Sequence, residues 1–184
     1  MKKINKQKID EIIRVNHAGE YGAQRIYSGQ IRFCKKKDLK KKLQSIIDEE
    51  YIHYKYFNDV MVKKRSRPTI MSPIWNHGGY LLGAVTSLMG EKYVHACTQA
   101  VEEVIVEHYN DQIKLLEKEK VEKQLLSKIK KFCADEDEHR HFAEKSNSNE
   151  KGVELFKSFT KNLTKLAIKV SKKLWLKVLA LNPN

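Results

Sequence analysis

Glutamate and histidine recur at matched spacings in the two halves of this sequence. Each half offers a lone glutamate and, 30 or 34 residues later, a second glutamate with a histidine three positions beyond it. The six residues are Glu20, Glu50, His53, Glu102, Glu136 and His139. Because residues three apart share one face of an α-helix, each Glu-x-x-His pair can direct a carboxylate and an imidazole at one point. The duplicated pattern predicts one shared site.

This set of side chains suits two metal ions. Two helices that each offer one Glu, and two that each offer Glu-x-x-His, supply the ligands of ferritin-like di-iron and di-manganese carboxylate bundles. Four carboxylates would neutralise two divalent ions, so such a site can be buried without a large net charge. Oxygen and imidazole ligands favour iron or manganese, and none of the three cysteines falls in the pattern.

An alternative choice for the second Glu-x-x-His pair lies two positions further along the chain. Glu138 and His141 have the same spacing as Glu136 and His139. A shift of two residues turns a helix by about 200°, so the two pairs cannot face the same site. The segment ADEDEH parallels IDEEYIH in the first half, which favours Glu136 and His139.

Five neighbouring residues are secondary candidates. Tyr27 and Tyr109 each follow a lone glutamate by seven residues and therefore share its helix face. With His108 they are candidates for proton or electron handling, although core packing is the commoner role of such tyrosines. Asp135 and Glu49 stand four residues before the two histidines, where they could be hydrogen-bond partners of the imidazoles. Solvated surface charge is the simpler interpretation of these two acids.

The elements that must position these side chains are helices. The apolar residues recur with a helical period almost throughout, and only three prolines occur in 184 residues. We expect an all-α protein with a four-helix bundle whose core helices span about 5–33, 39–62, 91–116 and 121–145, within a single domain covering residues 1–184. Gly19 and Gly22 flank Glu20, and their cost in helix propensity suggests that the first helix approaches a neighbour closely.

Two segments lie outside the bundle pattern. Residues 68–90 contain no Asp, Glu, Lys or Arg, but Pro68 and Pro73 interrupt the run. The helical remainder, 80–89, is about 15 Å long, which is too short to span a hydrocarbon core of about 30 Å. We therefore expect a short membrane-associating helix that lies on a bilayer or dips into it.

The C-terminal segment, about 153–181, has the pattern of an amphipathic helix. Its apolar stripe comprises Phe156, Phe159, Leu163, Leu166, Val170 and Leu174, and its basic stripe comprises Lys157, Lys161, Lys165 and Lys169. This pattern is typical of a basic helix at a membrane interface. A helix docked on the bundle with a solvated lysine face explains it equally well.

The composition favours an anionic partner. The formal net charge is +13, but only six of the 36 basic residues are arginine, which weakens the case for nucleic acid. An anionic membrane surface is the better candidate. Three widely spaced cysteines suggest a reducing cytoplasm, and neither a secretion signal nor an import peptide is indicated at the N-terminus.

Three blocks of the sequence resemble the Coq7 family, the 5-demethoxyubiquinone hydroxylases of ubiquinone biosynthesis. The blocks are RVNHAGEYGAQRIYSGQI, ACTQAVEEVIVEHYNDQI and FCADEDEH, and the resemblance covers roughly residues 9–145. Carried over by position, the iron ligands of the family fall on the six residues already selected by spacing. The gapless match of FCADEDEH also favours Glu136 and His139 over the shifted pair.

The resemblance implies an O2-dependent hydroxylation of a polyprenyl demethoxy-quinol at a di-iron centre, with NADH as the ultimate reductant. It also implies a peripheral protein on the cytoplasmic face of the inner membrane, with a membrane-embedded quinol, anionic lipid and other ubiquinone-biosynthesis proteins as partners and no nucleic acid. Three alternatives remain: a ferritin-like iron-oxidising or storage protein, a non-catalytic membrane-binding protein and a nucleic-acid binder, the last resting on charge alone.

Overall fold

The computed structural model describes residues 6–145, 148 and 150–181, and the side chains as far as residue 172. Its helices are α1 (Lys6–Phe33), α2 (Lys37–Lys64), α3 (Ser72–Met89), α4 (Glu91–Glu119), α5 (Lys123–Lys145) and α6 (Lys151–Leu181). No strand occurs in the described part of the chain. The all-α prediction is confirmed, and the four core helices match their expected bounds to within a few residues.

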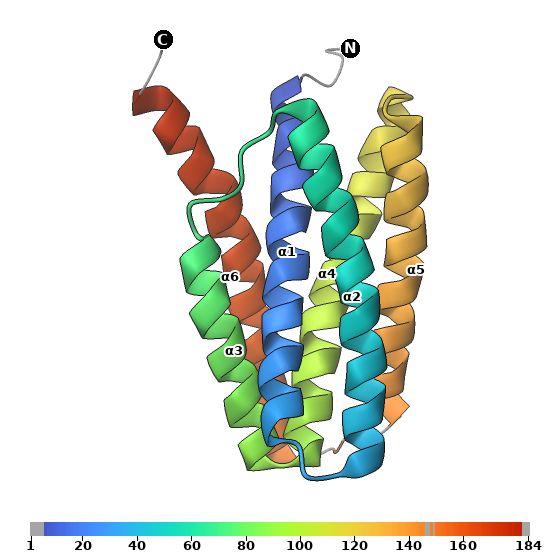
Figure 1. The fold of residues 1–184 in the computed structure, drawn as a ribbon, viewed down its shortest axis with the longest axis vertical. Helices are drawn as coiled ribbons and strands as arrows, with labels where there is room; N and C mark the ends of the chain where they lie inside the picture. The colour runs from blue at the N-terminus through green and yellow to red at the C-terminus, as the bar shows by residue number, and fades with distance from the viewer. Residues whose placement is uncertain (1–5, 146–147, 149, 182–184) are drawn as a thin grey trace.

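The core bundle consists of α1, α2, α4 and α5, and it forms as two helical hairpins. Three residues connect α1 to α2, and three connect α4 to α5, so each pair is antiparallel (Figure 1). The chain leaves α4 through Lys120, whose left-handed backbone at φ 52° closes the helix end. α3 packs mainly on α1 and α6 mainly on α4, so both lie outside the four core helices on one flank (Figure 1).

Two apolar layers fill the bundle, one toward each end. One contains Ile13, Phe57 and Ile129, from the start of α1, the end of α2 and the start of α5. The other contains Leu43 and Ile46, from the start of α2, together with residues from the end of α1. The polar residues of the sequence pattern fall between these two layers on every core helix, so the fold buries them at mid-height.

The structure corrects the expected length of the third helix. α3 begins at Ser72, about eight residues before the predicted start at residue 80. Pro73 lies in the first turn, where its missing N–H and fixed φ are tolerated, and so it starts the helix instead of breaking it. Within the described residues, no helix combines the length and apolar character needed to cross a bilayer.

Glycines allow α1 and α3 to touch backbone to backbone. A Cβ atom on Gly83 would lie 1.9 Å from the carbonyl oxygen of Ile26, and one on Gly29 would lie 2.2 Å from that of Tyr80. Both distances are far below any real contact, so only glycine fits at these two positions. This glycine seam fixes α3 against the helix that carries Glu20.

The expectation that Gly19 and Gly22 serve the same purpose is wrong. A Cβ on Gly19 would meet only Ile105, at an ordinary 3.7 Å, and a Cβ on Gly22 would meet nothing within 4 Å. These glycines instead line an open space beside α1. α3 does come close to the α1 backbone at the Gly22 carbonyl oxygen, but the glycine that permits this contact is Gly79 of α3, whose Cβ would lie 3.0 Å from that oxygen.

α6 is docked on the bundle through its basic stripe. Lys161 pairs with Glu103 at 2.6 Å, and Lys165 pairs with Glu107 at 2.9 Å, so two successive turns of α6 are attached to α4. Phe156 turns inward and its ring centroid lies 5.5 Å from that of Tyr93. The docked alternative therefore holds for α6, with Lys161 and Lys165 of the basic stripe paired to acids of α4.

The apolar stripe of α6 is largely exposed. Phe159, Leu163 and Leu166 of the predicted stripe are 40 to 61% exposed, and Leu155, which was not predicted to belong to it, is 73% exposed. Leu174, expected in the same stripe, lies outside the residues whose side chains are described. On the neighbouring α3 and the segment before it, Ile70, Ile74, Leu81, Val85, Leu88 and Met89 are 40 to 67% exposed. We call these ten residues the apolar face.

Candidate metal centre

The bundle brings all six residues of the sequence pattern together at its centre. Each of them is at most 3% exposed. α1 supplies Glu20, α4 supplies Glu102, and α2 and α5 each supply a Glu-x-x-His pair. Their ligand atoms form two groups of four, in each of which all atoms lie within 4.8 Å of one another. The groups are Glu20, Glu50, His53 and Glu136, and Glu50, Glu102, Glu136 and His139.

Two glutamates belong to both groups, which gives the site its symmetry. Glu50 and Glu136 are shared, whereas each of the other two glutamates and each histidine belongs to one group. Glu136 lies between the imidazoles, with its oxygens 3.0 Å from Nδ1 of His53 and 3.1 Å from Nδ1 of His139. The arrangement therefore offers two adjacent ion positions with two carboxylates able to bridge them.

The outer nitrogen of each histidine reaches an acid from the opposite hairpin. His53 Nε2 lies 3.1 Å from Asp135, and His139 Nε2 lies 2.9 Å from Glu49. A proton on Nε2 would be donated to these carboxylates, which leaves Nδ1 free to bind a metal ion. Sequence spacing suggested pairs within each hairpin or plain surface charge, and the structure corrects both: the pairs cross between the hairpins.

The hydrogen bonds of the two tyrosines also run from one hairpin to the other. The hydroxyl of Tyr27 on α1 donates to Glu102, and that of Tyr109 on α4 donates to Glu20. Both phenols are at most 2% exposed. Burial, followed by nearby glutamate charge, raises the pKa of both tyrosines well above its ordinary value, so they remain protonated donors. Each tyrosine holds the lone glutamate of the other hairpin.

The electrostatics of the site fit a cation. Burial and the charge of Glu136 raise the pKa of Glu50 and Glu102 well above the usual carboxylate value. Burial alone would also raise the pKa of Glu136, but hydrogen bonds with His139 and His53 lower it to about 2. Both oxygens of Glu50 and one oxygen of Glu102 are buried without a hydrogen-bond partner. Divalent ions would satisfy these oxygens and would make ionised carboxylates favourable there.

The shifted Glu-x-x-His pair and His108 lie away from the cluster. Glu138 and His141 are exposed on the outside of α5, so the shifted Glu-x-x-His pair does not face the site. His108 is also outside the cluster, because its position one residue before Tyr109 turns it by about 100°. Its Nε2 lies 2.7 Å from Gln112 Nε2, and burial with nearby Lys172 and Lys8 lowers its pKa to about 3. The structure gives no support to His108 as a catalytic group.

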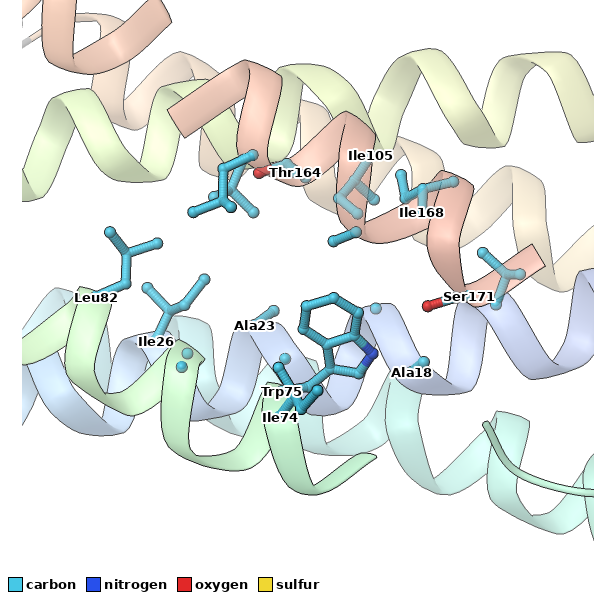
Figure 2. A pocket seen from close by; sticks show the side chains of 18 residues that line it. Ala18, Ala23, Ile26, Ile74, Trp75, Leu82, Ile105, Thr164, Ile168 and Ser171 are labelled. Carbon is cyan, nitrogen blue, oxygen red and sulfur yellow. The ribbon is translucent and has the colours of Figure 1, made fainter. Parts of the chain in front are cut away.

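An apolar cavity of about 240 Å³ adjoins the ligand-bearing helices. It lies between α1 and α4 on one side and α3 and α6 on the other, and its lining includes Gly19, next to Glu20, and Val101, next to Glu102. In Figure 2, Trp75 of α3 and Ile168 of α6 extend into this space. The cavity therefore lies between two of the ligand-bearing helices and the two helices that form the apolar face, and none of the six central residues is among its lining.

Comparison with known proteins agrees with this geometry. The family model of the ubiquinone biosynthesis protein COQ7 matches residues 7–171, nearly the whole chain. The chain belongs to the COQ7 family. Membership of the COQ7 family also establishes the ferritin-like character of the bundle.

Named COQ7 relatives come from bacteria and eukaryotes. The chain is 49% identical over 138 residues to the NADPH-dependent 3-demethoxyubiquinone 3-hydroxylase, mitochondrial, of Rattus norvegicus, covering 74% of this chain and 64% of the relative. It is 39% identical over 133 residues to the 3-demethoxyubiquinol 3-hydroxylase of Rhodospirillum rubrum, covering 72% and 62%. It is 38% identical to the 5-demethoxyubiquinone hydroxylase, mitochondrial, of Saccharomyces cerevisiae. The chain thus spans somewhat less than two thirds of the rat and bacterial relatives.

Proposed function

We propose that this chain hydroxylates a ring carbon of a polyprenyl demethoxy-benzoquinol with O2, at a di-iron centre held by the six buried residues. The observation that carries the proposal is the pair of ligand groups sharing Glu50 and Glu136 beside an apolar cavity, in a chain of the COQ7 family. The rat relative is named as a 3-demethoxyubiquinone 3-hydroxylase and the bacterial relative as a 3-demethoxyubiquinol 3-hydroxylase, which supports this substrate and reaction. When bound, two ferrous ions supply the activation of O2 that the hydroxylation requires.

The apolar cavity is the proposed site of the prenyl tail. Its walls are aliphatic and aromatic, with Thr164 and Ser171 among its few polar groups, so a hydrocarbon chain gains free energy on leaving water there. Gly19 and Gly22 leave room directly beside α1. A ring at the end of a tail bound here would lie near Glu20, and the apolar walls would keep bulk water from it.

Hydrogen bonds with two tyrosines and two acids outside the cluster fix the positions of the central residues. The hydroxyls of Tyr27 and Tyr109 each donate a hydrogen bond to Glu102 and Glu20 respectively, and Asp135 and Glu49 orient the two imidazoles. Because all four contacts cross between hairpins, they fix the two halves of the site relative to one another. This preorganisation reduces the rearrangement that binding of metal and substrate would otherwise demand.

We further propose that the apolar face rests on the membrane that holds the quinol. Its ten exposed residues lie on α3, α6 and the segment before α3, beside the cavity. The net charge of +13 favours an anionic surface such as the cytoplasmic face of an inner membrane. In vesicle co-sedimentation, Leu88→Glu combined with Phe159→Glu should weaken binding at least tenfold, whereas Val62→Glu on α2 should not. Equal losses in both variants would refute this orientation.

Product analysis tests the enzymatic proposal. Iron-loaded protein in lipid should convert a demethoxy-quinol to a product heavier by one oxygen atom. An iron-oxidising or storage protein with the same ligands would instead consume ferrous iron and leave the quinol unchanged. Retention of full activity by Glu102→Ala would contradict the assignment of the site.

A further inference from the structure

A second polar layer lies beyond the metal centre at each end of the α1–α4 pair. Aligning the two lone glutamates of the sequence pairs Gln30 with Gln112 and Asn16 with Thr98. Each glutamine follows a central tyrosine by three residues, and Asn16 or Thr98 precedes a lone glutamate by four, so all four lie near the helix face that carries the metal ligands. The duplication therefore predicts two equivalent side-chain contacts, one on each side of the centre.

One of the two contacts is a direct pair of amides. Asn16 Nδ2 donates to Gln112 Oε1 at 2.8 Å, and Gln112 Nε2 donates to Asn16 Oδ1 at 2.7 Å. Both residues are at most 4% exposed. Because asparagine and glutamine each carry a donor and an acceptor, the two amides satisfy one another within the protein.

The equivalent direct contact between Gln30 and Thr98 is not made. Gln30 is 0% exposed and Thr98 is 2% exposed. Neither polar atom of the Gln30 amide nor the Thr98 hydroxyl has a hydrogen-bond partner among the described residues. A threonine hydroxyl is a single polar atom one bond closer to the backbone than an asparagine amide, so it cannot repeat the reciprocal pair. Buried polar atoms in this state are costly unless another molecule completes their hydrogen bonds.

The helix directions bring Gln30 and Thr98 to the same level of the bundle. Tyr27 of α1 donates its hydroxyl proton in a hydrogen bond to Glu102 of α4, which fixes the two helices relative to one another. Gln30 lies about one turn farther along α1, and Thr98 about one turn back along α4. Because α1 and α4 run in opposite directions, both steps lead the same way (Figure 1). The same steps from the other tyrosine–glutamate pair lead to the two amides whose contact is direct.

A pocket of about 230 Å³ approaches this level from the end of the bundle. Its lining runs from the exposed Lys35 to Ser87 and Val94. The Ser87 hydroxyl donates to the backbone carbonyl oxygen of Gln30 at 2.9 Å. Val94 precedes Thr98 by four residues, which is about one turn of α4. The pocket therefore brings solvent to within about one helical turn of both side chains.

We infer that a water molecule binds between Gln30 and Thr98 and links α1 to α4 beside the metal centre. Water can accept a hydrogen bond from the Gln30 amide and donate to its oxygen or to the Thr98 hydroxyl, so one molecule can make the roughly two to four hydrogen bonds usual for a buried water. Both side chains are neutral, which suits water better than an ion. The two ion positions therefore differ in their surroundings: bound water lies one turn from Glu102, and the amide pair lies one turn from Glu20.

Nuclear magnetic resonance can detect such a water directly. Zinc-loaded protein, which is diamagnetic, is labelled with ¹⁵N in its glutamine side chains, and cross-relaxation between the side-chain amide protons and water is measured. We expect the signal of a long-lived water at Gln30 and at most about one fifth of it at Gln112. The exposed Gln44 calibrates the signal of transient surface water, which has the opposite sign.

Exchanging the two residue types should reverse the pattern. Thr98→Asn should form the direct amide pair and reduce the Gln30 signal about fivefold or more, and Asn16→Thr should create a signal at Gln112.

Three results would overturn the inference: no long-lived water at Gln30, equal signals at the two glutamines, or an unchanged Gln30 signal in Thr98→Asn. The comparison of Gln30 with Gln112 needs only the wild type, so it decides the matter even where a variant fails to fold. None of these outcomes depends on the proposed hydroxylation.

Discussion

Glu50 on α2 and Glu136 on α5 are both members of each ligand group, so each ion position depends on both of them. Glu20 and Glu102 each belong to only one group. The six residues are alike in burial, but this sharing makes their expected effects on metal binding unequal.

The number of metal ions bound by each variant should show that Glu50 and Glu136 serve both ion positions. Glu50→Gln and Glu136→Gln should lose both ions, because each removes a ligand from both positions, whereas Glu20→Gln and Glu102→Gln should retain one ion per chain. Glu138→Gln, on the exposed side of α5, is the matched control and should bind as wild type. Elemental analysis after anaerobic reconstitution with ferrous iron measures the difference. Equal losses in all four site variants would contradict the assignment of bridging and terminal roles.

The hydrogen bonds that the two tyrosines donate across the hairpins should strengthen metal binding. Tyr27→Phe or Tyr109→Phe removes the hydrogen bond to Glu102 or Glu20 and should weaken metal binding about tenfold to a hundredfold, as expected for loss of a partner that orients a ligand. Competition with a coloured chelator gives the affinity. Tyr93→Phe, at the α4–α6 contact, serves as the control. Wild-type affinity in both site variants would show that these hydroxyls only fill the core.

Metal removal should make stability fall as pH rises. Burial and the charge of Glu136 raise the folded-state pKa of Glu50 and Glu102, so their contribution is present below the unfolded pKa and is lost as pH rises through the folded values. His53 and His139 act in the same direction: burial alone would lower their pKa, but Glu136 and other nearby carboxylates raise it to about 11 and about 9. The contribution of Glu136 is lost only as pH falls toward about 2.

Thermal melts of chelator-treated protein should therefore show a midpoint that decreases from pH 5 to pH 9. Metal-loaded protein should show a smaller decrease, because bound ions keep the carboxylates ionised at no cost. Glu50→Gln should flatten the metal-free profile. A metal-free midpoint that rises over this range would be inconsistent with the buried carboxylates described.

The glycine seam should be sensitive to a single methyl group. Gly83→Ala places a Cβ against the Ile26 carbonyl oxygen and should lower the free energy of unfolding by about 1–3 kcal/mol or more, since the contact is with backbone. Gly78→Ala, in the same helix with nothing within 4 Å, should stabilise the protein by about 0.5–1 kcal/mol. Urea unfolding compares the two. A Gly83→Ala protein as stable as wild type would mean that α3 is not held by this seam.

The sequence predicted the bundle and the six central residues because helical periodicity and the duplicated pattern are local signals. It could not show which glutamates are shared, or that Tyr27, Asp135 and their counterparts reach across to the other hairpin. Spacing along one helix gives the face of a residue, whereas its partner depends on how two hairpins pack. The crossed contacts are a property of tertiary structure alone.

The expectations for Pro73 and for the two glycines beside Glu20 were wrong for a similar reason: the effect of proline or glycine depends on its position in the folded structure. Pro73 was expected to interrupt a helix, but in the first turn it begins one. Gly19 and Gly22 were expected at a close helix contact, but a Gly can mark either close approach or open space, and the sequence does not distinguish them.

Labelled oxygen gives the most direct test of the central claim. Ferrous-loaded protein in lipid vesicles is supplied with a demethoxy-quinol, reduced nucleotide and ¹⁸O2, and the quinol is analysed by mass spectrometry. The account predicts a product carrying one ¹⁸O atom on the ring, and no such product from Glu102→Ala. Oxidation of the iron with an unlabelled, unchanged quinol, or undiminished labelling by Glu102→Ala, would contradict it.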